Sequence, residues 1–269
     1  MMMEAGLPPR YEIRVLGPEH IEWVSALVTH TNIFHSPVWP VVYPDDKTAR
    51  LHDAMRNVEY LVRHQVESGH SLGVFDNEYQ FKRDQSKATG GRLYWDQDDT
   101  EASGDQLLEQ MDFALVSVAL AYDSAHPLDH ARMEGLIGAM PLYATFYGAL
   151  ERLDPRPRSS WAADKPGELL LRNATNTRSD YEGRGLMKKM AHCMMHTAAA
   201  KGFRGIQIET LSDAVQHVWA NPPPPFSGQV VSAFDTLTYE EEDEGGDKVY
   251  PFRPANQKAT KIYCSLKAN

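Results

Sequence analysis

Two glycines in the middle of a strand, turn and helix pattern could bind an anion. Gly183 and Gly185 follow an apolar run at 168–171 and precede a Met-, Ala- and Lys-rich stretch, 186–201, that predicts a helix. Residues 206–211 then alternate as a strand. A helix that begins directly after such a turn presents unpaired backbone N–H groups and the positive end of its dipole. This arrangement is typical of a phosphate site, although a purely structural unit without a ligand has the same pattern.

The same segment resembles the acyl-CoA-binding segment of the GNAT superfamily of N-acetyltransferases. The resemblance rests on YEGRGL at 181–186, the helix after it and the Gly202-Phe203 pair before the next strand. The family motif is Gln or Arg, two residues, Gly, one residue, then Gly or Ala. Gly185 matches it, whereas Glu182 and Met187 depart from it. The resemblance implies an α/β fold, with a mixed, mostly antiparallel central sheet flanked by helices.

The resemblance also implies acetyl-CoA as co-substrate and indicates which residues hold it. The pyrophosphate would lie on the glycine turn, and backbone groups at the end of the preceding strand would hold the pantetheine arm. Trp219 falls where the family commonly has a tyrosine that protonates the leaving thiolate. The implied cofactor-binding residues are Asn176, Thr177, Glu182, Gly183, Arg184, Gly185, Leu186, Met187 and Trp219.

Acetyl transfer to an amine requires a group that accepts a proton, often through water. Glu209 on the following strand and His217 beyond it are the candidates, with Asp213 behind them; by the resemblance, all border the thioester. Glu209 could equally be an exposed strand residue and His217 a surface helix residue. Because an indole N–H is not an ordinary proton donor, His217 or Tyr181 would replace the missing tyrosine.

The composition describes an ordinary globular protein. The chain has 269 residues, of which 42% are hydrophobic and 24% charged, enough for one large or two small domains. A formal net charge of -10 argues against a nucleic-acid partner and suits a basic amine. We expect no membrane segment and no signal peptide, and a reduced cytoplasmic setting for Cys193 and Cys264, with nuclear access left open.

We predict a single GNAT-like domain over residues 1–269. Residues 1–75 would form the acceptor side, 76–166 an insertion that is either a lid or a homodimer interface, and 167–269 the acyl-CoA half. Further predicted strands cover 11–16, 71–75, 93–95, 113–122, 229–234 and 259–266. Predicted helices cover 19–34, 48–68 and 127–150, the last broken near Pro141, and predicted loops cover 81–92, 96–112 and 238–248.

Aromatic residues near the first helix are candidates for the acceptor pocket, with a place in the core as the alternative for each. They are Trp23, His30, Phe34, His35, Trp39 and Tyr43. His192 and His196 have a spacing that can bind a metal, but no third ligand is apparent, so we predict no metal site.

The leading hypothesis is an acyl-CoA-dependent N-acetyltransferase that acts on a small-molecule amine by direct, base-assisted transfer from acetyl-CoA. The alternatives are a GNAT-fold protein that binds acyl-CoA with little or no transfer, and a protein or peptide N-acetyltransferase.

Overall fold

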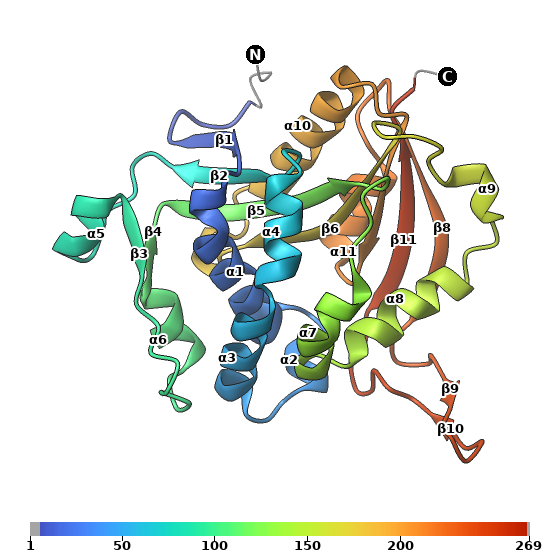
Figure 1. Cartoon of the computed structure of the whole chain (residues 1–269), viewed down its shortest axis with the longest axis horizontal. Coiled ribbons are helices and arrows are strands. Elements are labelled where there is room, and N and C mark those ends of the chain that lie inside the picture. Colours follow the sequence, from blue (N-terminus) through green and yellow to red (C-terminus); the bar gives the residue numbers. More distant parts are fainter. Residues whose placement is uncertain (1–5, 268–269) are drawn as a thin grey trace.

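A computed structural model describes residues 6–267 and shows a central sheet between two layers of helices (Figure 1). The sheet contains seven strands in the order β1 (Tyr11–Val15), β2 (Leu72–Asp76), β5 (Leu115–Asp123), β6 (Leu169–Thr177), β7 (Gly205–Thr210), β11 (Lys258–Ser265) and β8 (Ser227–Asp235). Only β6 and β7 pair in parallel; the other neighbouring strands are antiparallel. The predicted mixed, mostly antiparallel sheet flanked by helices is confirmed.

One face of the sheet is covered by α10 (Leu186–Ala200) and α11 (Asp213–Ala220). Met190 and Met194 of α10 pack with Ile206 and Ile208 of β7 in a buried apolar cluster. The methionine-rich sequence of α10 therefore fills the core beneath the sheet.

The opposite face carries more helices. They are α1 (Ile21–His30), α2 (Trp39–Val42), α3 (Lys47–Asn57), α4 (Glu59–Glu67), α7 (Glu134–Ala139) and α8 (Leu142–Arg152). Helices α1 and α4 lie against β5, and α8 lies against β8 and β11. A π-helical turn, η2 (Thr31–His35), continues α1. The second core forms between these helices and the sheet.

The remaining elements are short. They are the 3-10 turns η1 (Pro18–His20), η3 (His130–Met133) and η4 (Ser179–Tyr181), the helices α5 (Asp84–Thr89), α6 (Gly104–Glu109) and α9 (Arg158–Trp161), and the paired strands β3 (Gly91–Leu93) with β4 (Met111–Phe113) and β9 (Glu241–Glu242) with β10 (Lys248–Val249). Pair β3–β4 extends from one end of the molecule and the acidic hairpin β9–β10 from the other (Figure 1).

Several predicted boundaries were wrong. The predicted helix 48–68 is two helices separated at Val58, with no proline or glycine to mark the break. Both predicted loops before β5 contain a short helix, α5 and α6. Helix α6 starts at a capping box in which Ser103 and Gln106 satisfy each other's backbone N–H. The predicted strand 93–95 lies earlier, at β3, and the predicted acidic loop contains the hairpin β9–β10. The predicted break at Pro141 is confirmed by α7 and α8.

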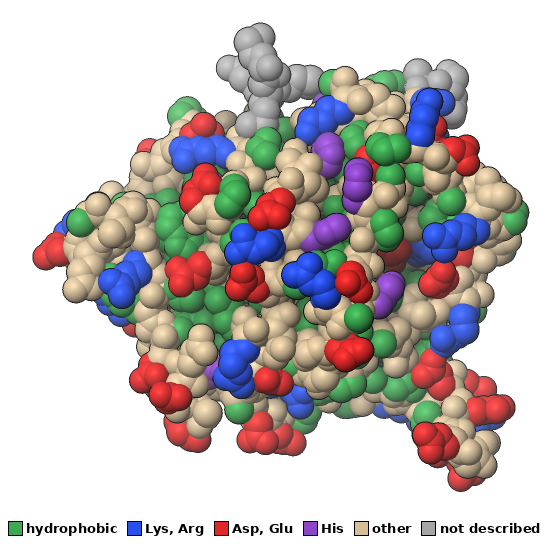
Figure 2. Space-filling model, viewed as in Figure 1, with side chains coloured by type: hydrophobic (Ala, Val, Ile, Leu, Met, Phe, Trp, Pro, Cys, Tyr) green, Lys and Arg blue, Asp and Glu red, His purple; other side chains and the backbone are tan. Residues whose placement is uncertain are grey.

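The surface carries charges of both signs. On the face drawn in Figure 2, the Lys and Arg side chains of the described residues are scattered among Asp and Glu side chains and do not gather into one basic patch.

Cys193 and Cys264 are free thiols, and both are buried. Over residues 6–267, every helix is too short or too polar to cross a bilayer.

A buried carboxylate connects the glycine turn to the end of β2. Asp76, at the end of β2, accepts two hydrogen bonds from Arg10 (2.8 and 2.7 Å), one from the Tyr181 hydroxyl (2.7 Å) and one from the Glu78 N–H (3.0 Å). Burial alone would raise the pKa of Asp76, but the bonds from Arg10 and Tyr181 outweigh it and hold the pKa below its usual range. Tyr181 directly precedes the turn, so this network fixes where the turn begins.

We expect Asp76→Asn to lower the free energy of unfolding by about 1–3 kcal/mol, because charge-assisted bonds become weaker ones at a buried site. A carboxylate with a depressed folded pKa stabilises above its unfolded pKa, and that contribution disappears as pH falls through the folded pKa. Thermal melts of both proteins should therefore differ by a few degrees at pH 7, and the difference should shrink as the pH falls below about 4. Equal melting midpoints at pH 7 would contradict this assignment.

Candidate active site

Strands β6 and β7 separate halfway along β6. Their parallel pairing runs from Leu169 and Gly205 to Arg172 and Ile208, and among the described residues it ends there. On its other side β6 stays paired with β5 as far as Thr177. Residues 173–177 therefore have one free strand edge, and this edge faces a gap in the sheet.

A β-bulge accompanies the separation. The β5–β6 register shifts between Leu120, which pairs with Ala174, and Ala121, which pairs with Arg172. Asn173 is thus the extra residue on β6. A bulge bends the strand that carries it and increases its twist, which turns the end of β6 away from β7.

The gap opens into a cavity of about 1140 Å³. One end is bounded by the glycine turn and the starts of α10 and α11, and the other end by η2, α7 and α8. This volume exceeds the range of about 300–1,000 Å³ common for a single small ligand. The cavity is therefore large enough to hold two reactants.

The glycine turn forms the first end of the cavity. Gly183 and Gly185 both have φ of 73°, a left-handed conformation that side chains rarely adopt. A Cβ at either position would meet no heavy atom within 4 Å, so backbone conformation and open space, not crowding, explain both glycines. Helix α10 begins at Leu186, and its first N–H groups have no partner within the helix. All the predicted residues from Glu182 to Met187 line the cavity.

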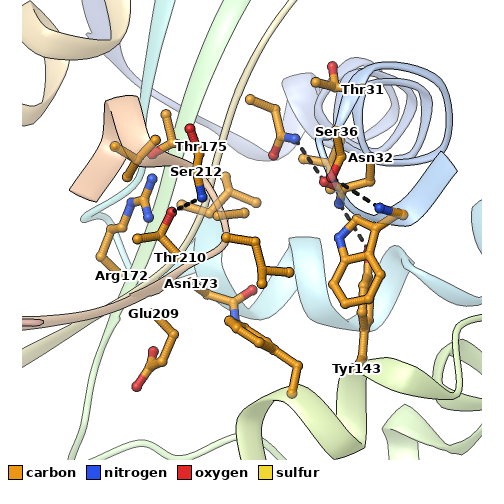
Figure 3. Close-up of a pocket in the computed structure, with 18 of the residues that line it drawn as sticks. Thr31, Asn32, Ser36, Tyr143, Arg172, Asn173, Thr175, Glu209, Thr210 and Ser212 are labelled. Atoms are coloured by element: carbon orange, nitrogen blue, oxygen red, sulfur yellow. Dashed lines mark hydrogen bonds between the residues drawn. The ribbon is translucent and has the colours of Figure 1, made fainter. Parts of the chain in front are cut away.

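A chain of amide hydrogen bonds crosses the middle of the cavity. The Asn176 Nδ2 donates to Asn32 Oδ1 (3.2 Å), and Asn32 Nδ2 donates to the Tyr143 hydroxyl (3.0 Å; Figure 3). The Oδ1 of Asn176 is buried and accepts no bond from residues 6–267. Asn176 and its neighbour Thr177 both line the cavity. An unpaired buried acceptor at this place favours a ligand with an N–H group.

Glu209 lies on β7 just beyond the last pair with β6 and lines the cavity (Figure 3). Burial raises the pKa of its carboxyl group to about 7, although the positive charges of Lys261 and Arg172 oppose the shift. Lys261 is the cross-strand neighbour of Glu209 on β11, but its ammonium group pairs with Asp154 (3.2 Å). Glu209 is thus a carboxyl group that gains or loses its proton near neutral pH.

The structure brings only some of the predicted catalytic residues together. Asp213, at the start of α11, lines the cavity with Glu209. His217 is exposed on α11 and does not line the cavity, and Trp219 is buried in the core outside it. Tyr181 lines the cavity, but its hydroxyl donates a hydrogen bond to Asp76.

Two cavity residues were missed by sequence reasoning. The Tyr147 hydroxyl on α8 accepts a hydrogen bond from Asn173 Nδ2 (3.0 Å), and burial raises its pKa, so the phenol keeps its proton at neutral pH. Arg172 is 2% exposed and lines the cavity. A charged residue at the end of the apolar run LLLR is a sequence signal that could have identified Arg172. Tyr147 had no such signal, since only the fold places α8 over the gap.

Of the predicted acceptor-pocket residues, His35 and Trp39 line the cavity. The other four lie outside its lining. Trp23 stacks on Phe113 with ring centroids 5.2 Å apart, and the ring of His30 bonds to the Gly104 carbonyl (2.8 Å), where burial lowers its pKa to about 4. These residues belong to the core.

Metal ligands are not grouped in the part of the chain that the structure describes, where no three His, Cys, Asp or Glu side chains are placed to share an ion. The ring of His196 instead packs on Phe226, with centroids 4.8 Å apart.

Comparison with known proteins shows the fold. No protein-family model and no curated protein sequence matches the chain. The C-terminal condensation domain of Ebony, solved with beta-alanyl-dopamine, matches with a TM-score of 0.58 and 16% identity over 95% of this chain and 98% of its own. Arylalkylamine N-acetyltransferase 2 from Aedes aegypti matches with a TM-score of 0.58 and 14% identity (96% and 99%). A polyamine N-acetyltransferase from Drosophila melanogaster matches at 0.51 and 11% (94% and 98%). The chain has the GNAT fold over nearly its whole length.

Proposed function

We propose that this protein is an acyl-CoA-dependent N-acyltransferase that transfers an acetyl group from acetyl-CoA to a small-molecule amine. The observation that carries the proposal is the single cavity that connects the glycine turn at α10 with Glu209 at the gap between β6 and β7. The shared fold of structures described as arylalkylamine and polyamine N-acetyltransferases supports it.

Acetyl-CoA would bind along the free edge of β6. Its pyrophosphate would accept hydrogen bonds from the N–H groups at the start of α10, where the dipole favours negative charge. Its pantetheine arm, which carries amide groups, would lie beside residues 173–177, whose backbone on that side has no partner strand. In this arrangement the thioester would lie near the bulge at Asn173, in the part of the cavity that Glu209 lines.

The reaction needs two proton transfers. The amine nitrogen attacks the thioester carbonyl, so that a C–N bond forms and the C–S bond breaks. Glu209 accepts the proton that the amine loses, directly or through water, and its pKa of about 7 suits this task at neutral pH. The departing thiolate requires a proton, and the Tyr147 hydroxyl on the same cavity wall is our candidate donor.

The acceptor end of the cavity indicates a compact amine with an apolar part. Its wall is built mainly by apolar and aromatic side chains from α2, η3, α7 and α8, among them Trp39, Met133, Leu136, Tyr143 and Phe146. Trp39 and Tyr143 meet edge to face with centroids 4.8 Å apart.

A second candidate function is an acyl-CoA-binding protein without transfer. It is favoured by Trp219, which stands where the family commonly has a tyrosine, and by Glu182, which stands where the family motif has Gln or Arg.

The direct test is calorimetric titration with acetyl-CoA, followed by thiol release against a panel of amines. Binding with amine-dependent thiol release supports the transferase. Binding without release by any amine favours the second candidate, and absence of binding would overturn both.

The glycine turn offers a matched pair of variants for acetyl-CoA binding. We expect Gly185→Val to weaken binding at least about 100-fold, because φ of 73° is strained for a β-branched residue and the helix start must move. Glu182→Gln should instead tighten binding by about 2–5-fold, because it removes an exposed negative charge near the pyrophosphate. Titration at low and high salt checks both, since only the Glu182 effect is electrostatic and should shrink with salt. Unchanged affinity in Gly185→Val would mean that the cofactor lies elsewhere.

Removing the proposed base should affect turnover without weakening the fold. We expect Glu209→Gln to reduce kcat at least about 100-fold with acetyl-CoA affinity within about 2-fold of wild type. In the wild type, kcat/KM should rise with pH and level off above about pH 7, where Glu209 is ionised. A carboxyl group with a raised folded pKa costs stability once ionised, so Glu209→Gln should not lower the melting midpoint at pH 8. Full activity in this variant would remove Glu209 from the mechanism.

A further inference from the structure

Arg172 is a buried cation without a partner. Its side chain is 2% exposed, its Nε is buried without a hydrogen-bond partner, and it forms no ion pair with residues 6–267. It sits at the last pair of the β6–β7 ladder and lines the cavity (Figure 3). Buried charges in folded proteins are nearly always paired, because desolvation without compensation is costly. Arg172 therefore indicates a missing anion.

The groups around Arg172 do not replace that anion. Its guanidinium carbon lies 5.8 Å from the ring centroid of Trp219, which gives a cation–π contact but no hydrogen-bond acceptor. The indole Nε1 of Trp219 is itself buried without a partner, so two orphan donors lie in the same region. Burial lowers the pKa of Arg172 to about 10, which still leaves it charged at neutral pH. Tyr147 and Glu209 are near enough to favour this charge, but neither forms a hydrogen bond or ion pair with Arg172 within residues 6–267.

We propose that one of the two reactants carries a carboxylate group and that Arg172 binds it inside the cavity. This inference rests on the proposed acyl transfer and names the chemical class of its substrate. A guanidinium group presents a planar pair of N–H donors that matches a carboxylate in a bidentate arrangement. The pyrophosphate of acyl-CoA does not fill this role, because its expected site is the start of α10, at the end of the cavity beyond residues 173–177.

The carboxylate could belong to either reactant, because Arg172 lies where the two would meet. On the acyl donor, it would be the terminal group of a dicarboxylic acyl chain. On the acceptor, it would be the carboxylate of an amino acid. In both cases the reaction is unchanged: a C–N bond forms, the C–S bond breaks and the carboxylate takes no part in the chemistry.

Thiol release with matched substrate pairs tests the proposal and separates these sources. The donor arm compares succinyl-CoA with butyryl-CoA at one fixed amine, and the acceptor arm compares tyrosine with tyramine, tryptophan with tryptamine and lysine with cadaverine, all with acetyl-CoA. In one of the two arms, we expect kcat/KM for the substrate with the carboxylate to exceed that for its partner without it by about 10–100-fold. This is the range that a charge-assisted hydrogen-bonded pair contributes. Arg172→Met should abolish that preference, and Arg172→Lys should keep part of it.

A stability measurement gives a readout independent of activity. Arg178 is equally buried, at 2%, but it bonds to the Met111 carbonyl (2.9 Å) and to both oxygens of Asp180 (3.1 Å each). Replacing a partnered buried arginine should destabilise the fold, whereas replacing an unpaired one should not. We expect Arg178→Met to lower the melting midpoint by several degrees and Arg172→Met to leave it unchanged or raise it.

The outcomes distinguish the two proposals. Acetyl transfer with no carboxylate preference in either arm, or a preference that survives in Arg172→Met, would overturn this inference and leave the proposed function intact. Failure to bind any acyl-CoA would overturn both. A lower midpoint for Arg172→Met than for Arg178→Met would show that Arg172 is structural and would also overturn the inference.

Discussion

The end of the β6–β7 ladder at Arg172 and Ile208 is the constraint on which the site depends. A parallel pair that continued to Thr177 would close the sheet and remove the cavity. The bulge at Asn173 bends β6 away, and the one-residue shift leaves its later residues paired to β5 alone. The sheet thereby gains an internal free edge in line with the start of α10. An extended ligand with an anionic end fits such an arrangement.

The cavity contains two ionisable groups, Glu209 and Arg172, whose charged forms are poorly stabilised in the protein without a ligand. Burial shifts the pKa of Glu209 and that of Arg172 toward the neutral forms, and neither group has an ion-pair partner among the described residues. Asp76 and Arg178 differ, because each of these buried charged groups has hydrogen-bond partners of opposite charge. Such a contrast is expected where stability is given up for binding or catalysis, because reactants supply the missing partners.

The structural neighbours show how widely one fold can be used. A condensation domain solved with beta-alanyl-dopamine and N-acetyltransferases of arylalkylamines and polyamines share the architecture at 16% identity or less. Fold similarity at this distance leaves the substrate to the individual side chains that line the cavity. In this chain those side chains include Arg172, Tyr147 and the Asn32–Asn176 pair, and they motivate the proposals made for it.

The sequence alone determined the local units. Apolar periodicity located β1, β2, β5 and β11, and the glycines at 183 and 185 identified the start of α10, because these features act over a few residues. The family resemblance named Glu209 as one of three candidate bases, and the structure shows that Glu209 lines the cavity. The break at Val58, the end of the β6–β7 ladder and the place of α8 over the gap depend on contacts between distant segments, so only the tertiary structure decided them. For the same reason, only the tertiary structure shows that His217 and Trp219 lie outside the cavity and that Tyr147 lines it. The direction of a side chain depends on how its helix packs, and helical periodicity does not specify that packing.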